Sequence, residues 1–150
     1  MSEETTRYFA DLRPGETFDL GTETVTEEEM VAFARRYDPQ PMHVDRATTD
    51  ESLFDGLVAS GWYTVAVSMR RFVDGVVDGE GVAVVAGVEV ERLRWPSPVR
   101  PGDTLHATAD LLDLADWDDD NGVARFDLRM RTDDGDAVLE LEKRVLVERE

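Results

Sequence analysis

Asp38 and His43 are the side chains of this sequence whose types and spacing could carry acid–base chemistry. They stand five residues apart in a segment that two prolines stiffen, Asp38-Pro39-Gln40-Pro41-Met42-His43-Val44-Asp45. Gly61 follows eighteen residues after His43, near the start of a strongly apolar stretch. A carboxylate, an imidazole and a backbone N–H at a helix start could supply a base, an acid and a donor to a developing negative charge. The sequence therefore points toward an enzyme.

The segment that ends at Asp38 has the signature of an amphipathic helix. Thr26-Glu27-Glu28-Glu29 is a capping box with Thr26 as the N-cap. Apolar residues then recur at positions 30, 33, 34 and 37, on one face of a helix. Because Pro39 disfavours helical geometry at the residue before it, the helix should end near Tyr37. Asp38 is therefore expected to leave a helix end and enter a rigid loop.

A second helix is predicted from about Ala59 to Phe72, at the centre of the domain. The stretch from Ala59 to Val73 contains no acidic residue, although the chain has 34. An unpaired buried carboxylate is costly, so this absence predicts near-complete burial of the helix. Small residues should let the helix lie close to a sheet. Its apolar stripe is expected to consist of Trp62, Val65, Ala66 and Met69.

The second half of the chain alternates with the period of two that is typical of strands. Apolar and polar residues alternate over 105–111, 124–130 and 139–147. A longer run from Val82 to Trp95 changes register near Arg92, which suggests a bulge or bend. There is no internal repeat and no linker, so residues 1–150 should form one domain. This pattern favours the α+β class, with a long-stranded antiparallel sheet wrapped around a helix.

Composition excludes several classes of partner. The net charge is −18, which should repel nucleic acid and anionic membranes. The apolar runs fall well short of the roughly 20 residues of a membrane span. There is no cysteine, so the compartment must be read from the missing secretory signal alone. The acidic start is unlike such a signal, and a cytoplasmic location is expected.

The surface resembles that of proteins from salt-loaded cytoplasms, because Lys143 is the only lysine among 16 basic residues. Self-repulsion costs stability unless salt screens it, and at 1 M salt the Debye length is about 3 Å. We therefore expect the melting temperature to rise between dilute buffer and molar KCl. The alternative is an ordinary acidic protein whose arginine content reflects a GC-rich coding sequence.

With these residues placed, the chain resembles the MaoC-like acyl dehydratase family, which includes the (R)-specific enoyl-CoA hydratases. The family motif is Asp-x-Asn-Pro-(aliphatic)-His, often continuing to x-Asp, and the matching residues here are Asp38, Pro41, His43 and Asp45. Gln40 replaces the usual asparagine, and Met42 replaces the aliphatic residue. A (His/Ser)-Gly pair that opens the central helix is matched by Ser60-Gly61. A later Pro-Val-x-Pro-Gly-Asp segment is matched over residues 98–103.

The resemblance implies a hot-dog fold, in which an antiparallel sheet wraps one long helix, and a homodimer or a multiple of dimers. It also implies hydration of 2-enoyl-CoA, or the reverse dehydration, without a metal or a cofactor, since CoA is part of the substrate. Asp38 would orient or deprotonate the water, and His43 would share that water and help deliver the proton to the α-carbon. The N–H of Gly61 would donate to the thioester carbonyl. The acidic surface favours CoA over an acidic carrier protein. Gln40 keeps an amide and is expected to brace the loop.

Two other functions remain open at this point. A hot-dog acyl-CoA thioesterase commonly places a carboxylate on the central helix or its entry, where Asp55 is the nearest acidic residue. A non-catalytic acyl-thioester-binding subunit would keep the fold without the chemistry.

Other polar residues have simpler interpretations. His106 lies on the polar face of a predicted strand and should be solvent-exposed. Asp118-Asp119-Asp120 lacks the ligand spacing of a calcium loop and should be a solvated turn. Among the arginines that could meet CoA phosphates, the sequence does not choose between Arg70, Arg71, Arg94 and Arg100.

Overall fold

The computed structural model describes residues 5–48 and 54–150. Within these residues five strands form one antiparallel sheet in the order β1-β3-β4-β5-β2. The strands are β1 (Thr17–Thr24), β2 (Val84–Arg94), β3 (Thr104–Asp116), β4 (Asn121–Thr132) and β5 (Ala137–Glu148). The α-helices are α1 (Glu27–Tyr37), α2 (Pro41–Val44) and α3 (Gly61–Phe72).

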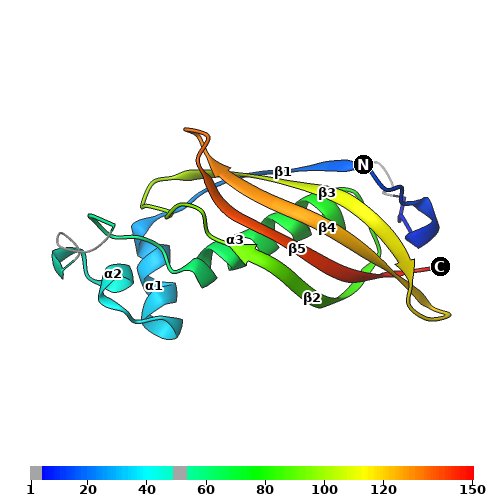
Figure 1. The fold of residues 1–150 in the computed structure, drawn as a ribbon, viewed down its shortest axis with the longest axis horizontal. Helices are drawn as coiled ribbons and strands as arrows, with labels where there is room; N and C mark the ends of the chain where they lie inside the picture. Colours follow the sequence, from blue (N-terminus) through cyan, green and yellow to red (C-terminus); the bar gives the residue numbers. More distant parts are fainter. Residues whose placement is uncertain (1–4, 49–53) are drawn as a thin grey trace.

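The sheet curls around α3, and α1 and α2 gather at the end of the molecule where α3 begins (Figure 1). Shorter helical turns occur at Phe9–Asp11 and Arg46–Thr48, and the π-helical turn Val73–Asp78 continues α3. This arrangement confirms the α+β class and the wrapped helix that the sequence predicts. That all 150 residues form one domain stays a prediction.

The inner face of the sheet and one face of α3 make the core. Along β3, β4 and β5 the predicted alternation is confirmed, because apolar side chains at every second position are buried. Phe126 of β4 is the centre of an aromatic group: the Phe72 ring lies 5.1 Å away and the Phe18 ring 5.8 Å away, both edge-on. The core face of α3 consists of Tyr63, Thr64, Val67, Ser68 and Phe72.

The predicted near-complete burial of α3 is therefore wrong, and the predicted apolar stripe is only partly in the core, since Val65 alone of its residues packs there. Trp62 is 57% exposed and Met69 is 47% exposed, so neither lies in the core. Both faces of this helix lack acidic residues, and hydrophobic periodicity alone could not choose between them. At the edge of the sheet, β2 also exposes apolar side chains. Together these residues form what we call the open apolar face: Trp62, Met69, Val85, Val88, Val90 and Trp95.

The bend predicted near Arg92 is present in β2. Arg92 has a φ of 55°, and the register against β5 shifts between Glu91 and Arg94. Two N-terminal features were not predicted. Strand β1 was missed because its polar residues and the positive-φ Gly21, where its register shifts, interrupt the alternation. Pro41 begins a one-turn helix where the sequence suggested only a stiff loop.

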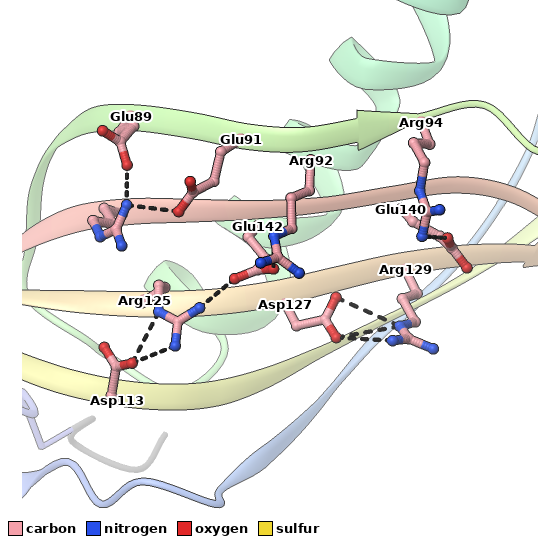
Figure 2. A network of polar contacts seen from close by, with 11 residues as sticks. Glu89, Glu91, Arg92, Arg94, Asp113, Arg125, Asp127, Arg129, Glu140 and Glu142 are labelled. Atoms are coloured by element: carbon pink, nitrogen blue, oxygen red, sulfur yellow. Dashed lines mark hydrogen bonds and ion pairs between the residues drawn. The ribbon is translucent and has the colours of Figure 1, made fainter.

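The outer face of the sheet carries a network of ion pairs (Figure 2). Arg144 of β5 contacts two glutamates of β2, and Arg125 of β4 bridges Asp113 of β3 and Glu142 of β5. Further pairs join Arg92 to Glu142, Arg94 to Glu140, and Arg129 to Asp127. Most of these side chains are partly exposed, so each pair stabilises the fold only weakly.

Lys143 stands on the opposite, inner side of β5, with 8% of its surface exposed. Its ammonium nitrogen lies 3.5 Å from the centre of the Phe72 ring and 3.5 Å from the sulfur of Met69. Burial lowers the pKa of Lys143 to about 8, and no carboxylate in the described part of the chain counteracts that change. The single lysine is thus a cation in an apolar setting, which opposes folding.

Replacing this cation by an isosteric apolar group should stabilise the fold. Lys143→Met is expected to raise the free energy of unfolding at pH 7 by up to about 3 kcal/mol, from the fall of the pKa from 10.5 to about 8. Because the folded-state pKa lies below the unfolded one, the penalty is present below pH 8 and is relieved as the pH rises to 10.5. Denaturant unfolding at pH 7 and pH 10 measures both effects. If the free energies of unfolding of variant and wild type differed by the same amount at both pH values, this account would be contradicted.

Candidate active site

Asp38 stands where the sequence places it, directly after the last residue of α1. Thr26 caps the start of this helix by accepting a hydrogen bond from the Glu29 N–H, as predicted. At the other end, the Asp38 N–H donates to the carbonyl of Ala34 at 2.7 Å, although the backbone of Asp38 is no longer helical. Pro39 prevents a further turn. The carboxylate of Asp38 therefore projects from a firmly bonded helix end.

His43 is buried on the one-turn helix α2, with 7% of its surface exposed. Its Nδ1 lies 2.9 Å from the carbonyl oxygen of Val58. Because a carbonyl only accepts, Nδ1 carries the proton, and a neutral ring presents its lone pair at Nε2. Nε2 lies 3.4 Å from Oδ2 of Asp38. The Val58 N–H in turn donates to the carbonyl of Met42 at 3.1 Å, so the same backbone segment fixes both the loop and the ring.

Both oxygens of the Asp38 carboxylate accept hydrogen bonds. The side-chain amide of Gln40 donates to Oδ1 at 2.7 Å, and the hydroxyl of Ser60 donates to Oδ2 at 2.7 Å. The Gln40 bond contributes most to lowering the pKa of Asp38; Ser60 and the nearby His43 lower it further, while partial burial opposes them. Asp38 is therefore ionised at neutral pH, as a base must be.

Ser60 and Gly61 open α3 at the edge of this group. Ser60 is the N-cap, and its hydroxyl oxygen also accepts from the Trp62 N–H at 3.3 Å. Gly61 is the first helical residue, and its N–H has no backbone acceptor within residues 5–48 and 54–150. The start of a helix carries partial positive charge. The Gly61 N–H can therefore donate to a negatively charged oxygen of a ligand.

Asp38, His43 and Gly61, which the sequence singles out, line one cleft of about 350 Å³. The rest of the lining is mainly apolar and includes Met42, Phe54, Val58, Trp62, Trp95, Pro96 and Pro98. An apolar cleft with a few converging polar groups is the usual form of a small-molecule site. The sequence did not reveal the bonds of Ser60 and Gln40 to Asp38, although a serine before a helix start is a capping signal.

The other polar residues have the partners expected of surface groups. His106 is exposed and contacts Asp133. The side chain of Asp118 accepts from the backbone of the turn that follows it.

In the part of the chain that is described, no group of three or more His, Asp or Glu side chains could hold a metal ion. No helix there is long and apolar enough to cross a membrane. The four arginines considered for CoA phosphates each contact a carboxylate or a backbone carbonyl: Arg70, Arg71, Arg94 and Arg100.

Comparison with known proteins identifies the family. The sequence model of the MaoC-like domain matches residues 9–128. The chain belongs to this family. Among curated proteins, the MaoC-like chain is 29% identical over 135 residues to the uncharacterized protein YdeM of Bacillus subtilis, covering 90% of this chain and 94% of that protein. It is 33% identical over 100 residues to protein MaoC of Klebsiella aerogenes, covering 66% of this chain but only 29% of that longer protein.

Solved structures agree with this assignment. A MaoC-like dehydratase from Rhodospirillum rubrum superimposes with a TM-score of 0.87 at 34% identity, covering 96% of this MaoC-like chain and 98% of the other. The R-hydratase PhaJ1 from Pseudomonas aeruginosa shares the fold with a TM-score of 0.73 at 24% identity, covering 95% and 86%. The HadBC 3R-hydroxyacyl-ACP dehydratase complex from Mycobacterium tuberculosis shares it with a TM-score of 0.74 at 21% identity, covering 89% and 96%. The hot-dog fold and membership of a dehydratase family are thus established.

The effect of the hydrogen bond from Gln40 on Asp38 can be tested through the pH dependence of activity. Gln40→Ala removes the donor that lowers the pKa of Asp38 most, so that pKa should rise and the acid limb of any Asp38-dependent activity should move to higher pH. Gln40→Asn, which restores the family's usual residue, should keep more activity than Gln40→Ala. Activity profiles that extend well below pH 3.8, the ordinary pKa of an aspartate, measure the shift. Superimposable profiles for wild type and Gln40→Ala would remove this role of the amide.

Proposed function

We propose that this MaoC-like protein adds water to 2-enoyl-CoA thioesters and removes it from 3-hydroxyacyl-CoA thioesters. The observation that carries the proposal is the placement of two proton-accepting groups beside a free backbone donor. Oδ2 of Asp38 and Nε2 of His43 lie 3.4 Å apart, in the same cleft that Gly61 lines. A hydro-lyase needs such a set, because water must be activated while negative charge collects on the thioester oxygen.

The first role of the Asp38/His43 pair is to hold the water. The ionised Asp38 and the Nε2 lone pair of neutral His43 are both acceptors, so a water molecule can donate one hydrogen to each. As the water oxygen bonds to C3 of the enoyl group, one of its protons passes to this pair. The other hydrogen stays on the new hydroxyl group. When the proton resides on Nε2, the imidazolium is stabilised by Asp38 and by its Nδ1–H bond to Val58.

The second role is to return that proton to the substrate. Electrons displaced from the double bond collect on the thioester oxygen, where the Gly61 N–H donates to them. The pair then delivers its proton to C2, which completes the addition, and every step runs backwards for dehydration. One preorganised donor of this kind can contribute about 3 kcal/mol to the transition state. General acid–base assistance typically adds about 10²–10⁴-fold.

The alternative functions have less support. A thioesterase of the kind considered would need a carboxylate at the entry of α3. Asp55 is exposed and does not line the cleft, where Asp38 is the one acidic residue among the described lining. A binding subunit without chemistry would not need the bonds that keep Asp38 ionised and His43 in one tautomer. Neither alternative explains the site as well.

Loss of the conjugated enoyl absorbance of crotonyl-CoA in molar KCl tests the proposal. Wild type should remove the absorbance, and Asp38→Asn should be slower by at least about 100-fold, since it removes the ionised acceptor. Asp55→Asn is the matched control, because asparagine tolerates the φ of 50° at this position. It should retain full activity.

A thiol assay on the same samples separates the outcomes. Release of free CoA that depends on Asp55 would identify a thioesterase. Tight acyl-CoA binding by folded wild type, with neither absorbance loss nor thiol release, would identify a binding subunit.

We propose further that two copies join through the open apolar face and the edge of β2. Strand β2 pairs with β5 on one side only, and its other edge has no partner strand in the described sheet. An open edge that exposes apolar side chains promotes aggregation of a single chain, and this edge exposes Val85, Val88 and Val90. The exposed side of α3 adds Trp62 and Met69. A second copy would bury these groups and would account for the lack of acidic residues on α3.

A charge placed on the edge strand should break this contact. Val90→Glu is expected to convert a dimer to a monomer with little loss of folded-state stability, because Val90 is 54% exposed in the single chain. Light scattering in molar KCl gives the molar mass of each protein. The matched control is Thr108→Glu, on the exposed face of β3. A monomeric wild type would overturn the proposed contact.

A further inference from the structure

Trp95 follows the last residue of β2 and lies directly against the start of α3. A methyl group placed on Gly61 would lie 2.6 Å from Cε2 and 2.7 Å from Nε1 of the Trp95 indole, closer than any real contact permits. With the indole in this position, no side chain fits at position 61. The two positions are 34 residues apart in the sequence, and no local pattern connects them.

The contact includes a hydrogen bond to the helix backbone. The indole N–H of Trp95 donates to the carbonyl oxygen of Gly61 at 2.9 Å. The Trp62 ring meets the Trp95 ring edge-on at 5.5 Å, which limits rotation of the indole. Trp95 is 41% exposed in the single chain and belongs to the open apolar face, so a second copy would bury more of the ring. Its polar contact with Gly61 is the specific feature.

The first turn of α3 is thereby held from two sides. Ser60 is bonded to the carboxylate of Asp38, and the next residue, Gly61, is bonded to the indole of Trp95. The cleft lies between these attachments, since Asp38, Gly61 and Trp95 all line it. A shift of the helix start by a fraction of an ångström would move the Gly61 N–H relative to the acid–base pair. Catalysis is sensitive to displacements of that size.

We propose that Trp95 is a positioning residue, whose indole N–H holds the first turn of α3 so that the Gly61 N–H meets the thioester oxygen while Asp38 and His43 face C3. This inference rests on the proposed function and goes beyond it, because it assigns a role to a side chain that takes no part in proton transfer. It predicts that loss of the indole donor impairs the chemical step more than substrate binding.

Trp95→Phe removes the N–H donor and keeps an aromatic ring against Gly61 and Trp62. With crotonyl-CoA we expect kcat to fall about fivefold to tenfold, the effect of one neutral hydrogen bond, while KM changes less than about twofold. Trp117→Phe is the matched control, because Trp117 is 54% exposed and lies in the β3–β4 connection, outside the cleft lining. It should have wild-type kinetics. Equal melting temperatures for the two variants exclude a general loss of folding, and equal molar masses by light scattering exclude a loss of the proposed dimer.

A spectroscopic measurement reports the proposed contact itself. The absorbance band of 2,4-hexadienoyl-CoA moves to longer wavelength when its carbonyl oxygen accepts a hydrogen bond. Bound to Asp38→Asn protein, which should turn it over at least about 100-fold more slowly, the thioester should show this red shift. The shift should be smaller when Trp95→Phe is added and unchanged when Trp117→Phe is added.

Each outcome either supports or overturns the positioning role of Trp95. A lower kcat and a smaller red shift for Trp95→Phe alone support the positioning role. Unchanged kcat and red shift, a change in KM alone, or an equal effect of Trp117→Phe overturn that role and leave the proposed hydration intact. Absence of both turnover in wild type and red shift in every protein overturns the inference together with the proposed function.

Discussion

The hydrogen bond from Ser60 to Asp38 joins the end of α1 to the start of α3, and the geometry of the cleft depends on it. Together with the two bonds that Val58 makes to Met42 and His43, it places the acid–base pair beside the backbone donor. The serine hydroxyl can make it because the same oxygen also caps α3, which fixes its rotamer. One small side chain thus caps a helix start and helps to keep a carboxylate ionised. The remaining contacts of the site refine an arrangement that this bond defines.

The elements that carry the site could be predicted because their signals are local. A capping threonine and a proline fix the two ends of α1, and Asp38 follows from them. Apolar and polar residues alternate along β3, β4 and β5 because one face of each strand is buried, and successive side chains of a strand point to opposite faces. The landmarks around His43 and Gly61 were likewise readable in order along the chain.

What could not be predicted depends on contacts between distant segments. Nothing in α3 distinguishes the face covered by the sheet from the exposed face, since both lack charge, and the choice is made by strands that come later in the chain. The indole of Trp95 reaches Gly61 across the fold, and the hydroxyl of Ser60 reaches Asp38, which lies 22 residues earlier in the sequence. Periodicity does not encode such pairings.

Charge is distributed unevenly over the molecule. In the ion-pair network of Figure 2, arginines and carboxylates are nearly balanced, so most of the net charge of −18 lies elsewhere. Lysine is absent from the outer face of the sheet and from the rest of the described surface, because the chain has a single lysine and the core encloses it. Thioesters acylate unprotonated amines, whereas arginine stays protonated. Under the proposed function, the described surface offers acyl-thioester substrates no lysine side chain to modify.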